Sequence, residues 1–189
     1  MKNMKSIAIA LVVAFTTLTA TAQTKKIDAS KSTIAWVGKK VTGQHNGTVN
    51  FKDGALTFKG GKLTGGTFNI DMTSIEATDL KAGEGKEKLE GHLKADDFFG
   101  TDKYPTSTLV FTSVKEKSKN VYVVNADLTI KGKTAPVAFE LTTGKNAAST
   151  AFNVDRTKYG ITFGSKNFFE GIGDKAVYDE FELTVKLVY

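Results

Sequence analysis

A histidine followed closely by two aspartates is the group of side chains most suggestive of chemistry in this sequence. His92 precedes Asp96 and Asp97, and an imidazole beside a carboxylate can transfer protons or bind a metal ion. A metal site would need a third converging ligand, which the sequence does not identify, and a helix-ending turn rich in aspartate explains the carboxylates equally well. We therefore expect no metal site. His92 is a candidate contact for the polar end of a ligand, with helix capping or a bond to a carbonyl as the alternative.

Arg156 is the only arginine among 26 basic residues. Its planar guanidinium suits a phosphate or carboxylate group, which makes it a second candidate headgroup contact. The alternative is a structural ion pair, for which Asp155 is a poor partner because neighbouring residues on a strand point to opposite faces. The sequence leaves both roles open.

Patterns typical of enzymes are weak. Ser165 lies between Gly164 and Lys166, without the Gly-x-Ser-x-Gly frame that would expose a serine nucleophile. Asp127 and Glu140 would form a hydrolase pair only if both faced one groove. We expect no catalytic residue, and an extracytoplasmic hydrolase remains an alternative.

The composition is that of one globular domain. The chain has 189 residues, of which 40% are hydrophobic and 24% charged, with a net charge of +6. Almost all the basic residues are lysines, whereas proteins that read phosphates and base edges rely on arginine, so nucleic-acid binding is disfavoured. The absence of cysteine excludes disulfides, thiolate nucleophiles and cysteine-bound metals.

The N-terminal residues have the pattern of an export signal. Lys2 and Lys5 precede the apolar run Ile7–Phe15, and Ala20-Thr21-Ala22 has the small-x-small pattern of a cleavage site. Nine apolar residues would span only about 14 Å as a helix, about half of a bilayer core. We predict cleavage after Ala22, so that a domain of residues 23–189 lies in the periplasm or is secreted.

The remaining residues alternate between apolar and polar along consecutive runs, which predicts antiparallel strands. The runs are 34–42, 48–51, 55–58, 67–75, 107–115, 121–130, 137–142, 151–155 and 181–187. Turns or bulges are expected at Gly60-Gly61, Gly65-Gly66 and 131–133, and a hairpin turn is expected at 115–119. Leu89 and Leu93 predict one short helix near residues 86–95.

About eight strands and one short helix favour an all-β fold, an eight-stranded antiparallel barrel, over a two-sheet sandwich. A sandwich that binds glycans through exposed aromatics remains an alternative. The barrel's apolar faces carry more large side chains than a plain core needs, so we expect them to line a cavity for a long apolar ligand. Phe98-Phe99 and Phe168-Phe169 would gate or plug the barrel end. The candidate lining residues are Trp36, Phe68, Phe111, Leu128, Phe139, Phe152, Phe181 and Leu183.

Five motifs in order resemble the bacterial YceI-like polyisoprenoid-binding family across nearly the whole chain after residue 22. One departure stands before His92, where the family often has an arginine–aspartate pair and this chain has Leu89-Glu90-Gly91. The motifs are Gly91–Lys94 with Asp97-Phe98-Phe99, Tyr104-Pro105-Thr106 with Leu109–Phe111, Asp127–Gly132 with Thr134 and Pro136-Val137, Val154–Arg156 with Tyr159–Ile161, and Gly173-Asp174.

The resemblance implies a lipocalin-like barrel with a long apolar cavity. It also implies that the ligand is a polyisoprenoid or another long-chain amphiphile, that the protein has no enzymatic activity and no cofactor other than such a ligand, and that it is periplasmic or secreted. A homodimer is a further expectation from the resemblance.

Overall fold

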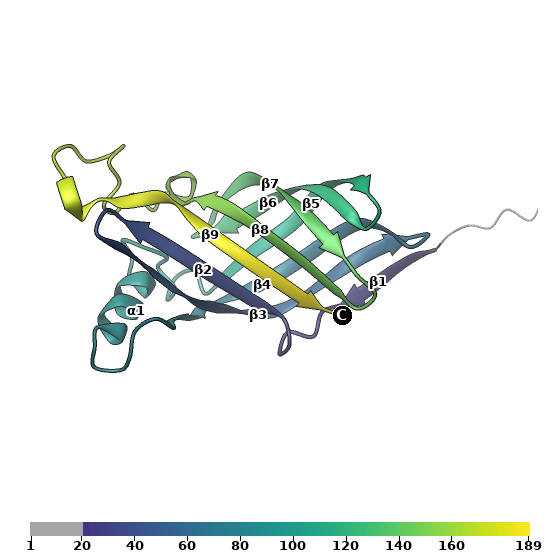
Figure 1. The fold of residues 1–189 in the computed structure, drawn as a ribbon, viewed down its shortest axis with the longest axis horizontal. Helices are drawn as coiled ribbons and strands as arrows, with labels where there is room; N and C mark the ends of the chain where they lie inside the picture. The colour runs from purple at the N-terminus through teal and green to yellow at the C-terminus, as the bar shows by residue number, and fades with distance from the viewer. Residues whose placement is uncertain (1–20) are drawn as a thin grey trace, which may run out of the picture.

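The computed structural model describes residues 21–189 (Figure 1), and the predicted signal segment lies outside them except for its last two residues. Its elements, in chain order, are β1 (Ala22–Lys26), β2 (Thr33–Lys40), β3 (Gly43–Lys59), β4 (Lys62–Ala77), α1 (Lys86–Lys94), β5 (Thr106–Ser118), β6 (Val121–Ile130), β7 (Lys133–Thr143), β8 (Ala147–Asp155), the 3-10 turns η1 (Arg156–Tyr159) and η2 (Gly173–Lys175), and β9 (Val177–Val188).

The strands form one antiparallel sheet that closes on itself. Its order is β1-β3-β2-β9-β8-β7-β6-β5-β4, and the additional pairing of β3 with β4 closes the sheet into a barrel. Strands β2 and β1 follow one another along the same edge of β3, where β2 pairs with residues 43–49 and β1 with residues 55–59. The prediction of an all-β, eight-stranded barrel with one short helix is confirmed, and β1 is an added strand that the alternation pattern missed.

Strand β3 is longer than the sequence pattern indicated. The runs 48–51 and 55–58 are one continuous strand whose register against β4 shifts at three places, between Thr48 and Asn50, Phe51 and Asp53, and Thr57 and Phe58. These irregularities break the period of two without ending the strand.

Of the two structures expected at Gly65-Gly66, the bulge is the one that forms: the pair lies inside β4 opposite Thr57 and Leu56, beside a shift of register. The hairpin turn predicted at 115–119 is wrong over most of its length. The lysine-rich segment 115–118 continues β5, and the turn comes at Lys119-Asn120. Asn120 has φ of 63°, a left-handed conformation that asparagine tolerates better than most residues.

The pairing between β7 and β8 is the weakest in the sheet. Only Thr142 with Ser149 and Thr143 with Ala148 are in register beside the hairpin. Farther along, η1 contacts β7 and takes the place of a paired strand. Tyr159 and Ile161, at and just after η1, are fully buried, so this seam is closed by side chains rather than by a backbone ladder.

Helix α1 covers one end of the barrel (Figure 1). It begins after Gly85, whose φ of 99° suits glycine, and it buries Leu93 against the core. The Glu90 carboxylate accepts a hydrogen bond of 2.9 Å from the Ala77 amide at the end of β4. Glu90 stands where the resembling family often has its charged pair, and here it attaches the helix to the sheet.

Candidate functional site: an apolar cavity inside the barrel

The barrel interior contains a cavity of about 160 Å³. Because successive residues on a strand point to opposite faces, side chains from one face of each of the strands β2 to β9 line this space. The volume is roughly ten times what one water molecule requires. The interior is thus partly filled by side chains and partly open, and it is not a solid plug.

Aromatic rings form a continuous row along the cavity wall. Phe68 packs against Phe51 at 5.9 Å and against Phe111 at 5.7 Å between ring centroids. Phe111 continues to Phe139 at 5.8 Å, and Phe139 stacks on Phe152 at 4.6 Å. These are ordinary aromatic packing distances, so neighbouring rings contact one another along the wall.

A glycine makes room for this row. A β-carbon on Gly66 would lie 2.8 Å from the Phe111 ring and 3.1 Å from Leu56. The missing side chain on β4 therefore lets a ring from β5 lie against the strand backbone.

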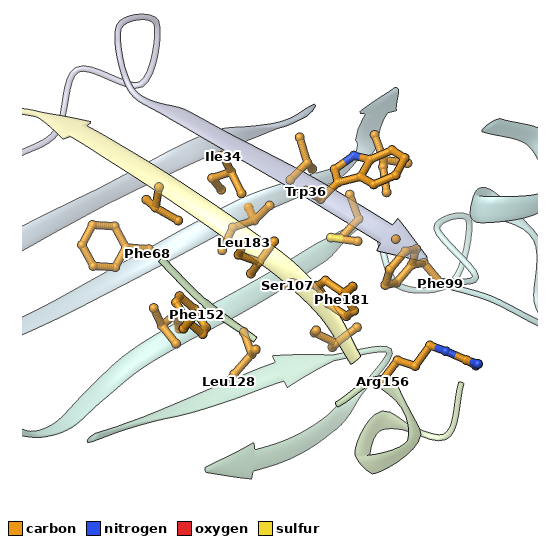
Figure 2. A pocket seen from close by; sticks show the side chains of 18 of the residues that line it. Ile34, Trp36, Phe68, Phe99, Ser107, Leu128, Phe152, Arg156, Phe181 and Leu183 are labelled. Carbon is orange, nitrogen blue, oxygen red and sulfur yellow. The ribbon is translucent and has the colours of Figure 1, made fainter. Parts of the chain in front are cut away.

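All eight predicted lining residues border the cavity: Trp36, Phe68, Phe111, Leu128, Phe139, Phe152, Phe181 and Leu183. Several of them, labelled in Figure 2, point into the same space from different strands. On β9 the inward side chains of Phe181, Leu183 and Val185 are only half-buried. They retain exposure because they face the cavity. Their contact with a ligand remains a prediction.

Phe98 and Phe99 line the cavity at the end that α1 covers. Phe99 is buried and lies 6.4 Å from the Phe181 ring, and Phe98 packs on Phe99 at 5.3 Å. Side chains with substantial exposure, including Tyr178 and Glu180, also border the cavity near this end, which is where it approaches the surface. Phe168 and Phe169 are 57% and 50% exposed and are not among the residues around the cavity.

His92 lies beside the cavity end rather than in its wall. Its Nε2 is 3.0 Å from an Asp97 carboxylate oxygen, and its ring meets those of Phe163 at 4.4 Å and Phe98 at 5.4 Å. Asp96 instead pairs with Lys103. The predicted imidazole–carboxylate contact exists with one of the two aspartates, and within residues 21–189 no group of three potential ligands could hold a metal ion.

Arg156 borders the cavity, but most of its donors are already bonded to the protein. Nη1 donates to the Ile161 carbonyl at 2.8 Å, while Nε and Nη2 donate to the Tyr178 and Val177 carbonyls at 3.1 Å each. Its charge partner is Asp179, at 3.4 Å, rather than Asp155. Burial lowers the pKa of the guanidinium, which the nearby carboxylates partly offset. The arrangement favours the structural role over the headgroup role.

The two carboxylates considered for hydrolysis are not a pair. Asp127 and Glu140 are both exposed on the outer face, and Glu140 forms an ion pair with Lys117. Glu140 is opposite Val123, four residues from Asp127 along β6. At about 3.3 Å per residue this is about 13 Å, farther than the roughly 5–9.5 Å between the carboxyl groups of glycosidases.

Sequence reasoning missed part of the cavity wall. Ile34, Val185 and Leu187 share a face with predicted residues, so the same alternation could have found them. Ser107 and Thr150 also line the cavity, but the alternation of apolar residues could not identify them because their side chains are polar. Among the described residues no helix is long and apolar enough to cross a membrane.

A single closed antiparallel sheet around an apolar cavity, with a short helix at one end, places this chain among the eight-stranded antiparallel β-barrels. Residues 26–189 match the model of the YceI-like domain. The chain belongs to the YceI-like family, as its motifs indicated.

Comparisons with individual proteins agree with this assignment. A UPF0312 protein of Shewanella denitrificans is 30% identical over 96 residues, which cover 50% of this chain and 47% of that protein. The chain thus aligns with about half the length of the curated relatives it matches. The crystal structure of Burkholderia cenocepacia BcnA superposes with a TM-score of 0.70 at 23% identity, over 86% of this chain and 99% of the other.

A second solved structure is a polyisoprenoid binding domain from Saccharophagus degradans implicated in plant cell wall breakdown. It superposes with a TM-score of 0.57 at 15% identity, over 86% of this chain and 95% of that domain. At these identities both structures establish a shared fold.

Proposed function

We propose that this protein is a non-enzymatic carrier that holds a polyisoprenoid or another long-chain amphiphile inside its barrel. The observation that carries the proposal is the apolar cavity, whose wall is a row of packed aromatic rings and aliphatic side chains from most of the strands. Such a wall suits a hydrocarbon chain, which has no hydrogen bonds to lose when it leaves water.

Burial of a chain is enough to drive binding. Each methylene removed from water contributes about 0.8 kcal/mol, so twenty carbons would contribute roughly 16 kcal/mol. Association costs about 4–15 kcal/mol in lost freedom of motion. A ligand of this length can therefore bind without a strong ionic contact. The polyisoprenoid binding domain among the structural neighbours supports the choice of ligand class.

We further propose that the protein acts outside the cytoplasm. The apolar run and the small-x-small pattern before residue 23 support export. Strand β1 begins at Ala22, so cleavage after this residue would leave nearly all of the strand on the barrel. N-terminal sequencing of the protein from culture fractions tests this, and Gln23 is the expected first residue. An intact N-terminus in the cytoplasmic fraction would refute it.

Native mass spectrometry of the protein purified from its own compartment tests the carrier function. The expected spectrum contains a species heavier than the bare chain by the mass of one long-chain amphiphile, which organic extraction then releases. The same spectrum reports whether the protein is a homodimer. If only the bare mass appears, and added long-chain lipid does not shift it, the carrier function is refuted.

A further inference from the structure

Two hydroxyl groups lie unpaired in the otherwise apolar cavity wall. Ser107 Oγ on β5 and Thr150 Oγ1 on β8 are buried, and neither has a hydrogen-bond partner among the residues that the structure describes. Burying a hydroxyl without a partner is unfavourable, because the group gives up its hydrogen bonds to water. Both residues border one cavity, and a rotation about the Cα–Cβ bond would turn either hydroxyl toward it, which indicates that something polar belongs inside.

Ser107 is the better placed of the two hydroxyls. The residue is only 4% exposed, whereas Thr150 is half-buried. Ser107 is on the inward face of β5, which it shares with Leu109 and Phe111.

The charged groups around the cavity are already occupied. Arg156 donates to three carbonyls and pairs with Asp179. Lys39 forms an ion pair with Glu182, and Glu180 accepts a hydrogen bond of 3.1 Å from Asn153. An anionic group drawn into the cavity would lose its hydration without gaining one of these cations, which is costly.

We propose that the ligand carries an uncharged hydrogen-bonding group, such as a hydroxyl, a carbonyl or an amide, and that this group bonds to Ser107 Oγ inside the barrel. This inference rests on the carrier function and deepens it. The hydrocarbon chain supplies the affinity, and Ser107 fixes where along the cavity the polar group stops. A hydroxyl can both donate and accept, so it accommodates each of these groups.

The test compares two probes with the same chain, 1-tetradecanol and tetradecane, delivered from cyclodextrin and measured by displacement of a fluorescent apolar dye. Ser107→Ala should weaken binding of the alcohol by about two- to tenfold, the worth of one hydrogen bond, and leave alkane binding unchanged. Ser118→Ala, at an exposed position on the same strand, should change neither.

A second readout separates ligand recognition from folding. Because Ser107 Oγ has no partner among the described residues, Ser107→Ala should not lower the Tm of the ligand-free protein, while it reduces the rise in Tm that 1-tetradecanol produces.

Several outcomes would overturn the proposal. Unchanged alcohol binding by Ser107→Ala would do so, as would a loss seen only in Thr150→Val. Tighter binding of tetradecyl phosphate than of 1-tetradecanol by the unmodified protein would contradict the uncharged group. Failure of every probe to bind would instead refute the carrier function.

Discussion

Filling the cavity from within should weaken ligand binding strongly without unfolding the barrel, and Leu183 is the position of choice. Leu183 lies on β9 between Trp36 of β2 and Phe152 of β8, its register partners on either side. It is half-buried because it faces the cavity. A tryptophan placed there extends into open space of about 160 Å³ and need not displace packed neighbours.

The magnitude follows from the chain that the new ring excludes. Tryptophan has about six more non-hydrogen side-chain atoms than leucine, and displacing only three ligand methylenes costs about 2.4 kcal/mol, roughly a fiftyfold loss of affinity. Isothermal titration calorimetry of a long-chain alcohol with Leu183→Trp should therefore show a loss of affinity of at least that size. The far-ultraviolet circular dichroism spectrum should retain its β-sheet form.

Thr184→Trp is the matched control, because Thr184 is the next residue on the same strand and points outward. It introduces the same ring at an exposed site and should bind the alcohol as the unmodified protein does. If Leu183→Trp binds normally, or if both variants lose affinity equally, the ligand does not occupy the barrel interior.

Three further changes test the fold, each by urea unfolding. Gly91→Ala should raise the free energy of unfolding by about 0.5–1 kcal/mol, because a β-carbon there meets nothing within 4 Å inside α1. Gly66→Ala should lower it by about 1–3 kcal/mol through overlap with Phe111. Burial raises the pKa of Tyr159 to about 12 from 10.0, so the contribution of its neutral phenol to the free energy of unfolding is complete below pH 10 and is lost as the pH rises through 12. Tyr159→Phe should remove this loss, so the free energy of unfolding should fall less steeply above pH 10. The same variant should not be destabilised at neutral pH, because the hydroxyl has no partner within residues 21–189.

The period of two accounted for most of the barrel. Along β6 and β9 the strand is regular, so the inward face could be assigned residue by residue, and Leu128, Phe181 and Leu183 were placed correctly in the wall. The pattern failed where the backbone is irregular. Bulges in β3 divided one strand into two apparent runs.

Glycine left two possibilities open that the sequence could not separate. A glycine pair is typical of a turn or of a bulge within a strand, and Gly66 lies within a strand, where the Phe111 ring occupies the place of its missing side chain. That contact joins residues 66 and 111, which no local pattern connects. Polar members of the cavity wall were missed for another reason: a serine such as Ser107 has no hydrophobic signal, and its importance comes from what surrounds it.

The sparse pairing between β7 and β8 has a mechanical consequence. Every other neighbouring pair of strands in the sheet shares at least five paired positions, whereas this one shares two. Separating these two strands therefore breaks fewer backbone hydrogen bonds than parting the wall anywhere else. A long flexible chain that entered between these strands would enter sideways along its whole length once Tyr159 and Ile161 moved aside, and it would not have to be threaded through one end of the barrel.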